Sequence, residues 1–145
     1  MNFGWLTPEE IQPDPDLDDI IAAQAEELAD MAPDFDWDRM QKACQLGFYR
    51  VWAAKDEGRI VAWVCFNIGQ PYHYASTSFA WDVGHYCAES YRPWLWIKLW
   101  RTALCALRDL GVQVIISHAN RRRPLDKAFR RLGFEPHGQM FRQVL

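Results

Sequence analysis

The sequence predicts a mixed α/β protein with a central sheet whose first strands are antiparallel and whose last two strands are parallel. Two β-rich segments, Phe48–Ala54 and Arg59–Ile68, flank the turn Asp56-Glu57-Gly58, which is typical of a hairpin. A third β-rich segment, Thr77–Cys87, follows them. The pattern then changes to a helical period and back again, which predicts a βαβ unit at the end of the sheet.

The βαβ unit is predicted from the helix Trp94–Leu110 and the strand Val112–Ser117, with Gly111 between them as the residue that ends the helix. The apolar side chains that form the predicted buried stripe are Trp96, Leu99, Trp100, Ala103, Leu107 and Leu110. Because a crossover helix joins its two flanking strands in parallel, the strand from Thr77 and the strand from Val112 should run side by side with a right-handed connection.

The length of 145 residues predicts a single domain, with an acidic strand-helix-helix entry over residues 1–47 and the sheet over 48–145. Thr7-Pro8-Glu9-Glu10 is a possible helix start with a capping box. A helix is expected over Leu17–Met31, and Asp36 should cap another helix over Trp37–Leu46.

The net charge of -3 conceals an asymmetry along the chain. Every charged residue before Arg39 is acidic, whereas eleven of the fourteen charged residues from Arg92 onward are basic. The two halves are solvated faces that partly neutralise each other, or surfaces for different partners. The loop Arg121-Arg122-Arg123 could contact phosphates, including those of nucleic acid, although no recognition-helix or zinc-finger pattern supports sequence-specific DNA binding.

Several classes of protein have no support in this sequence. It holds no apolar run of eighteen residues and no basic leader followed by an apolar core, so we expect neither a membrane span nor a secretory signal. Its cysteines are scattered without a CxxC pair, which indicates reduced thiols in a cytoplasm and no zinc or other metal. No P-loop, Ser-His-Asp order or metal-ligand pair occurs.

The second half of the chain resembles the GCN5-related N-acetyltransferases, the GNAT superfamily. The matching residues are Tyr91-Arg92 before the helix from Trp94, then the strand Val112–Ser117 followed by Asn120, and finally Phe129-Arg130-Arg131-Leu132-Gly133-Phe134. The resemblance covers about the last seventy residues and implies acyl transfer from acetyl-CoA to an amine. In size and motif decay the chain is also similar to short GNAT-like proteins of tailed bacteriophages, some of which accompany virion or DNA-packaging proteins, which implies a host cytoplasm or virion location.

Two departures from the family pattern bear on function. The resemblance places the cofactor site at Tyr86, Cys87, Arg92, Asn120 and Arg121, but Pro93, Leu95 and Ile97 stand where the family has phosphate-binding glycines. Pro93 lacks an N–H, and the side chains of Leu95 and Ile97 should lie where phosphates approach. We therefore expect weak acetyl-CoA binding or none, with Arg92 as the remaining phosphate contact.

The second departure is Phe129, which stands where many family members carry the tyrosine that protonates the departing thiolate. That role could pass to Tyr86, Cys87 or Tyr91. A general base would come from Asp82, His85 or Glu89, of which His85 has the natural proton affinity, although a lone histidine in an aromatic strand is commonly a packed or surface residue. The candidate catalytic residues are therefore His85, Glu89 and Tyr91.

Two functions remain open from the sequence. The first is a GNAT-fold protein with an eroded acetyl-CoA site, which is non-catalytic and serves as a binding or structural component. The second is an active acyl-CoA-dependent N-acyltransferase with a remodelled site. Trp94 lies about 160° around the helix from Trp96, so it should point away from the core, where it would contact another chain or be covered by the acidic N-terminal segment.

Overall fold

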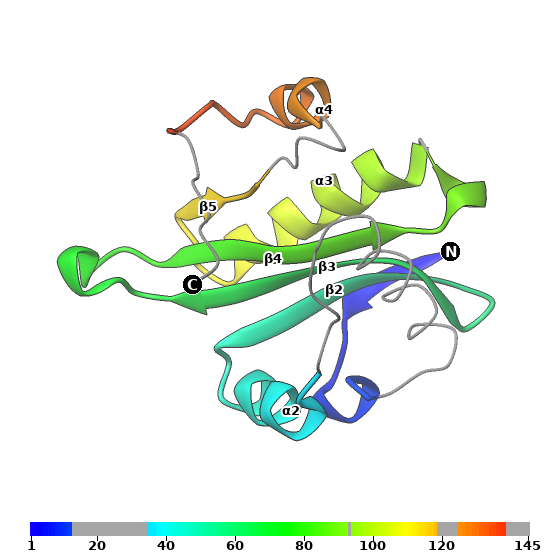
Figure 1. Cartoon of the computed structure of the whole chain (residues 1–145), viewed down its shortest axis with the longest axis horizontal. Coiled ribbons are helices and arrows are strands. Elements are labelled where there is room, and N and C mark those ends of the chain that lie inside the picture. The colour runs from blue at the N-terminus through cyan, green and yellow to red at the C-terminus, as the bar shows by residue number, and fades with distance from the viewer. Residues whose placement is uncertain (13–34, 93, 119–124, 139–145) are drawn as a thin grey trace, which may run out of the picture.

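The computed structural model describes residues 1–12, 35–92, 94–118 and 125–138. The five strands that it contains form one sheet in the order β1-β2-β3-β4-β5 (Figure 1). Their bounds are β1 Asn2–Trp5, β2 Tyr49–Asp56, β3 Arg59–Gly69, β4 Phe79–Cys87 and β5 Val114–Ile116. Neighbouring strands from β1 to β4 are antiparallel, and β4 and β5 are parallel. The predicted mixed sheet and its parallel last pair are confirmed.

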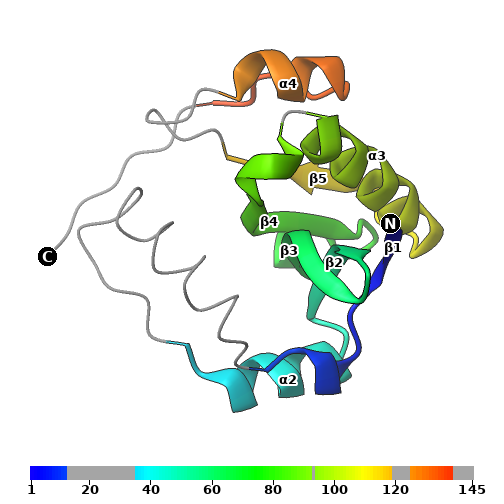
Figure 2. The same ribbon diagram turned by 90° about the vertical axis from the view of Figure 1, so that its right-hand side faces the viewer.

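Helices lie on both faces of this sheet (Figure 2). The described helices are α2 Trp37–Gln45, α3 Trp94–Asp109 and α4 Asp126–Arg131, together with the 3-10 turns η1 Pro8–Glu10, η2 Tyr72–Tyr74 and η3 Glu89–Tyr91. The α3 and α4 helices cover one face, and α2 and η1 cover the other. The helix predicted over Leu17–Met31 lies outside the described residues.

The hairpin between β2 and β3 forms where the sequence predicts it. Asp56 pairs with Arg59, so Glu57 and Gly58 make a two-residue turn. Both turn residues have positive φ, 49° and 87°. This conformation matches the right-handed twist of the strands and is inexpensive for glycine, which explains the position of Gly58.

Local signals also place the helix ends. The carboxylate of Asp36 accepts a hydrogen bond from the Arg39 N–H at 2.9 Å, so the predicted N-cap of α2 is confirmed. The α3 helix ends before Gly111, and the Val112 N–H donates back to the Leu107 carbonyl at 3.0 Å. That bond satisfies one of the carbonyls left unpaired at a helix end.

The side chains of β3 alternate between two hydrophobic clusters. Ala62, Val64 and Phe66 belong to the cluster beneath α3, whereas Trp63 and Cys65 belong to the cluster that includes residues of α2. Burial disfavours the thiolate and raises the pKa of Cys65 to about 12. This strand is therefore covered on both faces.

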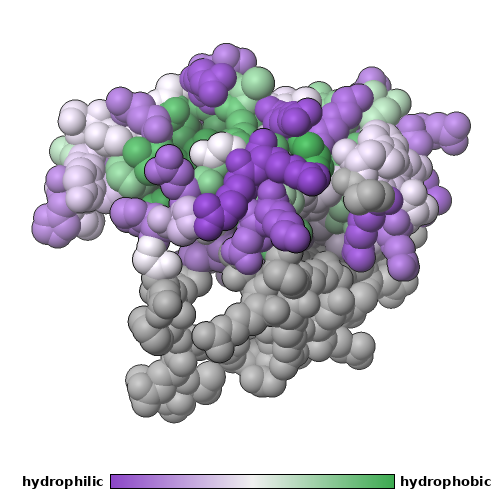
Figure 3. Space-filling view, turned by 90° about the horizontal axis from the view of Figure 1, so that it is seen from above, coloured by the Kyte–Doolittle hydropathy of each residue, from purple (hydrophilic) through white to green (hydrophobic). Residues whose placement is uncertain are grey.

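The buried stripe of α3 differs from the predicted one at its two ends. Leu110 is 43% exposed because it lies beyond the last residue of the helix, so its predicted burial is wrong. Leu95, which the sequence placed near the phosphate approach, is instead fully buried. Seen from the side that carries α4, hydrophobic side chains show between hydrophilic ones (Figure 3).

Candidate functional site at the fork between β4 and β5

The parallel strands β4 and β5 pair over only three residues in the described part of the chain. Phe79, Ala80 and Trp81 pair with Val114, Ile115 and Ile116, and β4 then continues alone to Cys87. The register of β4 against β3 shifts here, so that Cys65 pairs with Gly84 and Phe66 with Asp82, leaving Val83 as an extra residue. Such a bulge bends a strand and increases its twist. We call the segment Asp82–Cys87 together with Ser117 the fork.

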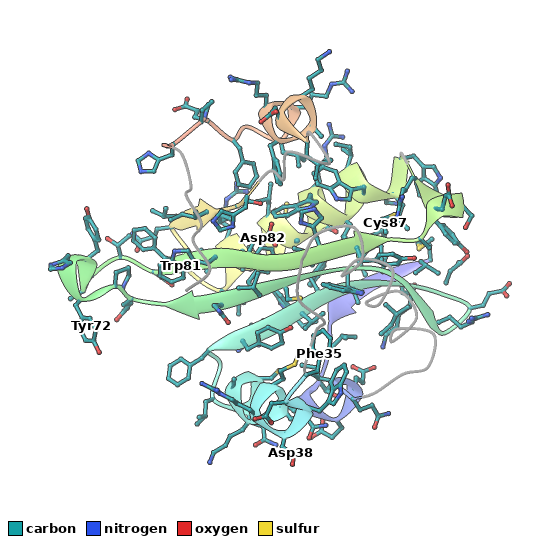
Figure 4. The ribbon with its side chains drawn as sticks, viewed as in Figure 1. Phe35, Asp38, Tyr72, Trp81, Asp82 and Cys87 are labelled. Carbon is teal, nitrogen blue, oxygen red and sulfur yellow. The ribbon has the colours of Figure 1, made fainter. Side chains whose placement is uncertain are left out.

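Asp82 lies at the branching point of the fork, midway along β4 (Figure 4). It is 5% exposed and is the one buried charged residue in the described ranges. Its carboxylate accepts hydrogen bonds from the Gly84 N–H at 3.0 Å and the Ser117 hydroxyl at 2.5 Å, and its Oδ2 lies 3.1 Å from Nδ1 of His85. A buried carboxylate is tolerated only when such partners replace water, so Asp82 joins β4 to the end of β5.

The imidazole of His85 lies among aromatic rings from two helices. Its centroid is 5.7 Å from each of Trp96 and Trp100 on α3 and 6.3 Å from Phe129 on α4. Because an ionised carboxylate can only accept, Nδ1 is assigned as the donor to Asp82. In the neutral ring the lone pair is then on Nε2. The histidine is therefore both packed and held by a carboxylate.

Phe129 closes the fork from the α4 side. Its ring is buried and lies 5.2 Å from Trp100 and 5.1 Å from Phe134. Phe134 reaches this position because Gly133, at φ +87°, ends α4 and the Phe134 N–H donates to the Phe129 carbonyl at 3.0 Å. The residues Leu132-Gly133-Phe134, which match the family motif, therefore form the end of α4 and bring the ring of Phe134 against that of Phe129.

Asp82 and His85 reach the same face of the sheet because of the bulge. Residues three apart on a regular strand point to opposite faces. With Val83 taken out of the register, both side chains align with Val64 and Phe66 on the α3 face. The sequence treated Asp82, His85 and Glu89 as separate base candidates and named Ser117 only as the end of a strand, because no local signal marks the bulge.

Tyr91 does not join His85. Its hydroxyl donates to Asp56 Oδ2 at 2.8 Å, next to the β2–β3 hairpin, and its ring is 6.4 Å from that of Trp94. The bond to Asp56 stabilises the neutral phenol and raises the pKa of Tyr91, while the same bond lowers the pKa of Asp56. Glu89 is exposed on η3. The catalytic roles predicted for Tyr91 and Glu89 stay predictions.

The residues assigned to the cofactor site are also divided. Tyr86 lies on the face opposite Cys87, with its ring 6.4 Å from that of Trp63. Cys87 is buried beneath α3, and burial raises the pKa of its thiol. The Nε of Arg92 donates to the Cys87 carbonyl at 2.7 Å, which ties Arg92 to the end of β4. Asn120 and Arg121, like Arg122 and Arg123, lie outside the described residues.

The side chains at the start of α3 divide between the core and the surface. Leu95 is 0% exposed and packs in the core, and Ile97 packs against the same cluster. Both side chains therefore pack against the core cluster, and the expected weak binding of acetyl-CoA stays a prediction. Trp94 is 53% exposed and confirms the expected outward direction. Pro93 lies outside the described residues.

The described residues contain no group of three His, Cys, Asp or Glu side chains that could hold a metal ion. None of the helices in the same ranges is long and apolar enough to cross a membrane. All four cysteines are free thiols.

Comparison with solved structures identifies the fold. An aminoglycoside acetyltransferase from an uncultured soil metagenomic sample superposes with a TM-score of 0.75 at 14% identity, covering 99% of this chain and 95% of that one. A ribosomal-protein-alanine N-acetyltransferase from Brucella melitensis gives 0.71 at 14% identity, with full coverage of both chains. The chain has the GNAT fold.

Another chain with the GNAT fold is a predicted acetyltransferase from Clostridium acetobutylicum, solved with acetyl-CoA. It has a TM-score of 0.70 and 13% identity, and the match covers 99% of this chain and 95% of that chain. No protein-family model matches the sequence, and no curated protein matches it. At these identities the likeness is one of fold, so the activity has to be argued from the fork.

Proposed function

We propose that this protein is an N-acyltransferase that transfers an acyl group from a CoA thioester to a primary amine. The observation that carries the proposal is the contact at the fork between the buried carboxylate of Asp82 and the partly exposed imidazole of His85, which lie 3.1 Å apart. A buried carboxylate beside a histidine costs folding free energy unless both are held in place, and such pairs concentrate at functional sites. The acetyltransferases that share this fold give the reaction class.

The described residues fit an acyl-CoA substrate. The helix α3 has sixteen residues, and the side chain of Leu95 near its N-terminus is buried in the core. Leu95 therefore does not block the approach of a phosphate to this helix end. Helix N-termini favour anions, and Arg92 beside this one could pair with a phosphate. The thioester supplies an activated acyl carbon when bound. In this proposal Arg92 and α3 bind the coenzyme, and His85 handles the proton.

The acceptor class follows from the chemistry of related folds. Two of the three named neighbours act on an aminoglycoside and on a ribosomal-protein alanine, according to their names, and both substrates offer an amine. A histidine with Nε2 as the acceptor suits removal of a proton from an amine nitrogen. We therefore expect a primary amine as the acceptor.

Two measurements test this function. Acetyl-CoA at about a hundred times its dissociation constant should stabilise the folded protein by about 2.7 kcal/mol in a thermal melt. Thiol release should follow when kanamycin or a peptide with N-terminal alanine is added. Arg92→Ala should reduce the thermal shift, whereas Arg101→Ala, an exposed arginine further along α3, should not. A protein that neither shifts nor releases thiol is not an acyltransferase.

A second function is favoured by one observation, the exposure of Trp94. An indole that is 53% exposed near Arg92 and Lys98 has the composition of an interface hot spot. In this second proposal the protein is a non-catalytic binding component that contacts a copy of itself or a larger assembly, such as a phage virion, through Trp94. Sedimentation of wild type and Trp94→Ala over a concentration series tests it, and identical profiles without association would reject it.

A further inference from the structure

The contacts of His85 indicate how its proton is handled. We propose that Asp82 and Ser117 hold His85 as the Nδ1–H tautomer, and that His85 carries a proton from the attacking amine to the departing sulfur. This role would replace the tyrosine that is absent at position 129. The inference rests on the proposed acyltransferase function. It assigns His85 as the catalytic residue and Asp82 and Ser117 as positioning residues.

Two donors orient the carboxylate of Asp82. The Gly84 N–H holds Oδ1 of Asp82 at 3.0 Å, and the Ser117 hydroxyl donates to Oδ2. Oδ2 therefore has a fixed position relative to both strands of the fork. The His85 ring is 3.1 Å from the same oxygen. Since an ionised carboxylate has no proton to donate, this contact requires Nδ1–H and leaves the lone pair of the neutral ring on Nε2.

Aromatic side chains restrict the orientation of the His85 imidazole. Trp96 and Trp100 meet the imidazole edge-on, at interplanar angles of 72° and 75°, and Phe129 meets it at 76°. These three rings also contact one another, so the imidazole packs against a single aromatic cluster, which limits rotation of the histidine about its side-chain bonds. A base that is held in one orientation needs no reorganisation when the reaction occurs, which favours proton transfer.

The imidazole of His85 lies next to the ring of Phe129. The resemblance places the thiolate-protonating group at residue 129, and the centroid of the His85 ring lies 6.3 Å from that of Phe129. The tyrosines considered as substitutes lie elsewhere, because Tyr91 donates to Asp56 and Tyr86 is on the opposite face. His85 is therefore the titratable side chain that the described residues bring to this position.

The proposed proton path balances without another reactant. The amine nitrogen attacks the thioester carbon and forms the C–N bond, and Nε2 of His85 accepts one proton from that nitrogen. The C–S bond then breaks, and the electron pair leaves with sulfur. The imidazolium returns the proton to the thiolate, so that an amide and a free thiol form and His85 is neutral again.

The alternative is that the three residues only fasten β4 to β5. A fastening would require the same hydrogen bonds and the same Nδ1–H tautomer, but it would have no effect on the chemical step, so the kinetic measurements below distinguish the two. Nitrogen-15 NMR of histidine-labelled full-length protein tests the tautomer itself, because the shifts of Nδ1 and Nε2 report which nitrogen carries the proton. We expect the Nδ1–H form in wild type and a shift toward Nε2–H in Asp82→Asn, whose carboxamide can donate to the ring.

The kinetic arm uses acetyl-CoA and an N-terminal alanine peptide, with thiol release as the signal. His85→Gln and Asp82→Asn should lower kcat by about 100-fold or more with little change in KM, as expected for loss of acid–base catalysis. The matched controls are His73→Gln on η2 and Asp109→Asn on α3, both exposed residues, which should keep the wild-type rate. Adding Phe129→Tyr to His85→Gln should restore the rate about tenfold, since a phenol can protonate sulfur.

Each outcome decides the inference. A wild-type Nε2–H tautomer overturns it even if the protein is fully active. A His85→Gln variant with a near-normal rate also overturns it and leaves the acyltransferase function intact. Absence of thiol release from wild type with each amine rejects the acyltransferase function, and the proton transfer with it. The Nδ1–H tautomer, the two losses in kcat and the recovery by Phe129→Tyr together support it.

Discussion

The two halves of β4 differ in their hydrogen-bond and packing partners. From Phe79 to Trp81 the strand is paired on both sides, with β3 and with β5, and its side chains are apolar. From Asp82 to Cys87 it keeps its pairing with β3, while β5 has ended, and side chains from α3 and α4 stand beside it. Asp82, at the boundary, bonds to Ser117 just beyond β5.

The difference shows how one strand can serve both stability and chemistry. The paired half needs only main-chain hydrogen bonds and apolar packing, which tolerate many sequences. The fork half needs specific partners, because a buried carboxylate and an imidazole must each be satisfied. Substitutions along this boundary therefore separate residues that support the fold from residues that support the site.

Removing the aromatic wall of the fork should cost most. Trp100 is fully buried, and its ring lies against His85 on one strand and Phe66 on the neighbouring one. Trp100→Ala should lower the free energy of unfolding by about 3–5 kcal/mol, because a large cavity remains. Urea denaturation measures the loss. Trp94→Ala on the same helix is the control and should change stability by less than about 0.5 kcal/mol; equal losses would contradict the assigned burial.

Removing the acceptor at the branching point should have the next largest effect. Asp82→Ala leaves the donors of Gly84, His85 and Ser117 without their carboxylate. We expect a loss of about 2–3 kcal/mol in urea denaturation, since buried donors lose their partner. Asp109→Ala, an exposed aspartate on α3, is the control. If the two variants are equally stable, Asp82 does not hold the fork together.

The end of α4 tests how the fork is closed. Gly133 has φ +87°, where a side chain costs about 1–2 kcal/mol. Gly133→Ala should lose this amount and loosen Phe134 from Phe129, which a thermal melt and tryptophan fluorescence would detect. Gly4→Ala has open space around the new methyl group and no positive φ, so it controls for the substitution itself. If Gly133→Ala leaves the stability unchanged, the backbone at this helix end is not constrained.

Beyond the end of β4, the Tyr91 hydroxyl donates a hydrogen bond to Asp56. The contribution of this bond to stability should depend on pH. The folded-state pKa of Asp56 is lowered, so its stabilising effect is present above the unfolded-state pKa and is lost as pH falls through the folded value. Tyr91→Phe should therefore be less stable than wild type near neutral pH, with a gap that narrows in acid. Chemical denaturation at several pH values measures it, and a constant gap would contradict the pairing.

The smallest effect on stability is expected at Trp94, where the effect should be on association. Because its indole is 53% exposed, Trp94→Ala should leave the melting temperature nearly unchanged. Under the second proposed function it should weaken self-association or binding to a larger assembly, as measured by sedimentation velocity. A large loss of stability with association intact would place Trp94 in the core.

The sequence by itself determined the elements whose signals are local. The β2–β3 turn, the Asp36 cap, the end of α3 at Gly111 and the parallel βαβ unit all follow from residues close together in the chain. Such signals depend on backbone preference and on period, which neighbouring residues set. The predicted outward direction of Trp94 has the same origin, because the helical period fixes the angle between residues.

Only the tertiary structure decided which side chains meet. The bulge at Val83 brings Asp82 and His85 to one face, and the end of β5 then places Ser117 beside them. Tyr91 bonds to Asp56, thirty-five positions away, and so is removed from the group in which the sequence placed it. These pairings depend on strand register and on helix packing across the sheet, and neither is encoded in the spacing of residues along one segment.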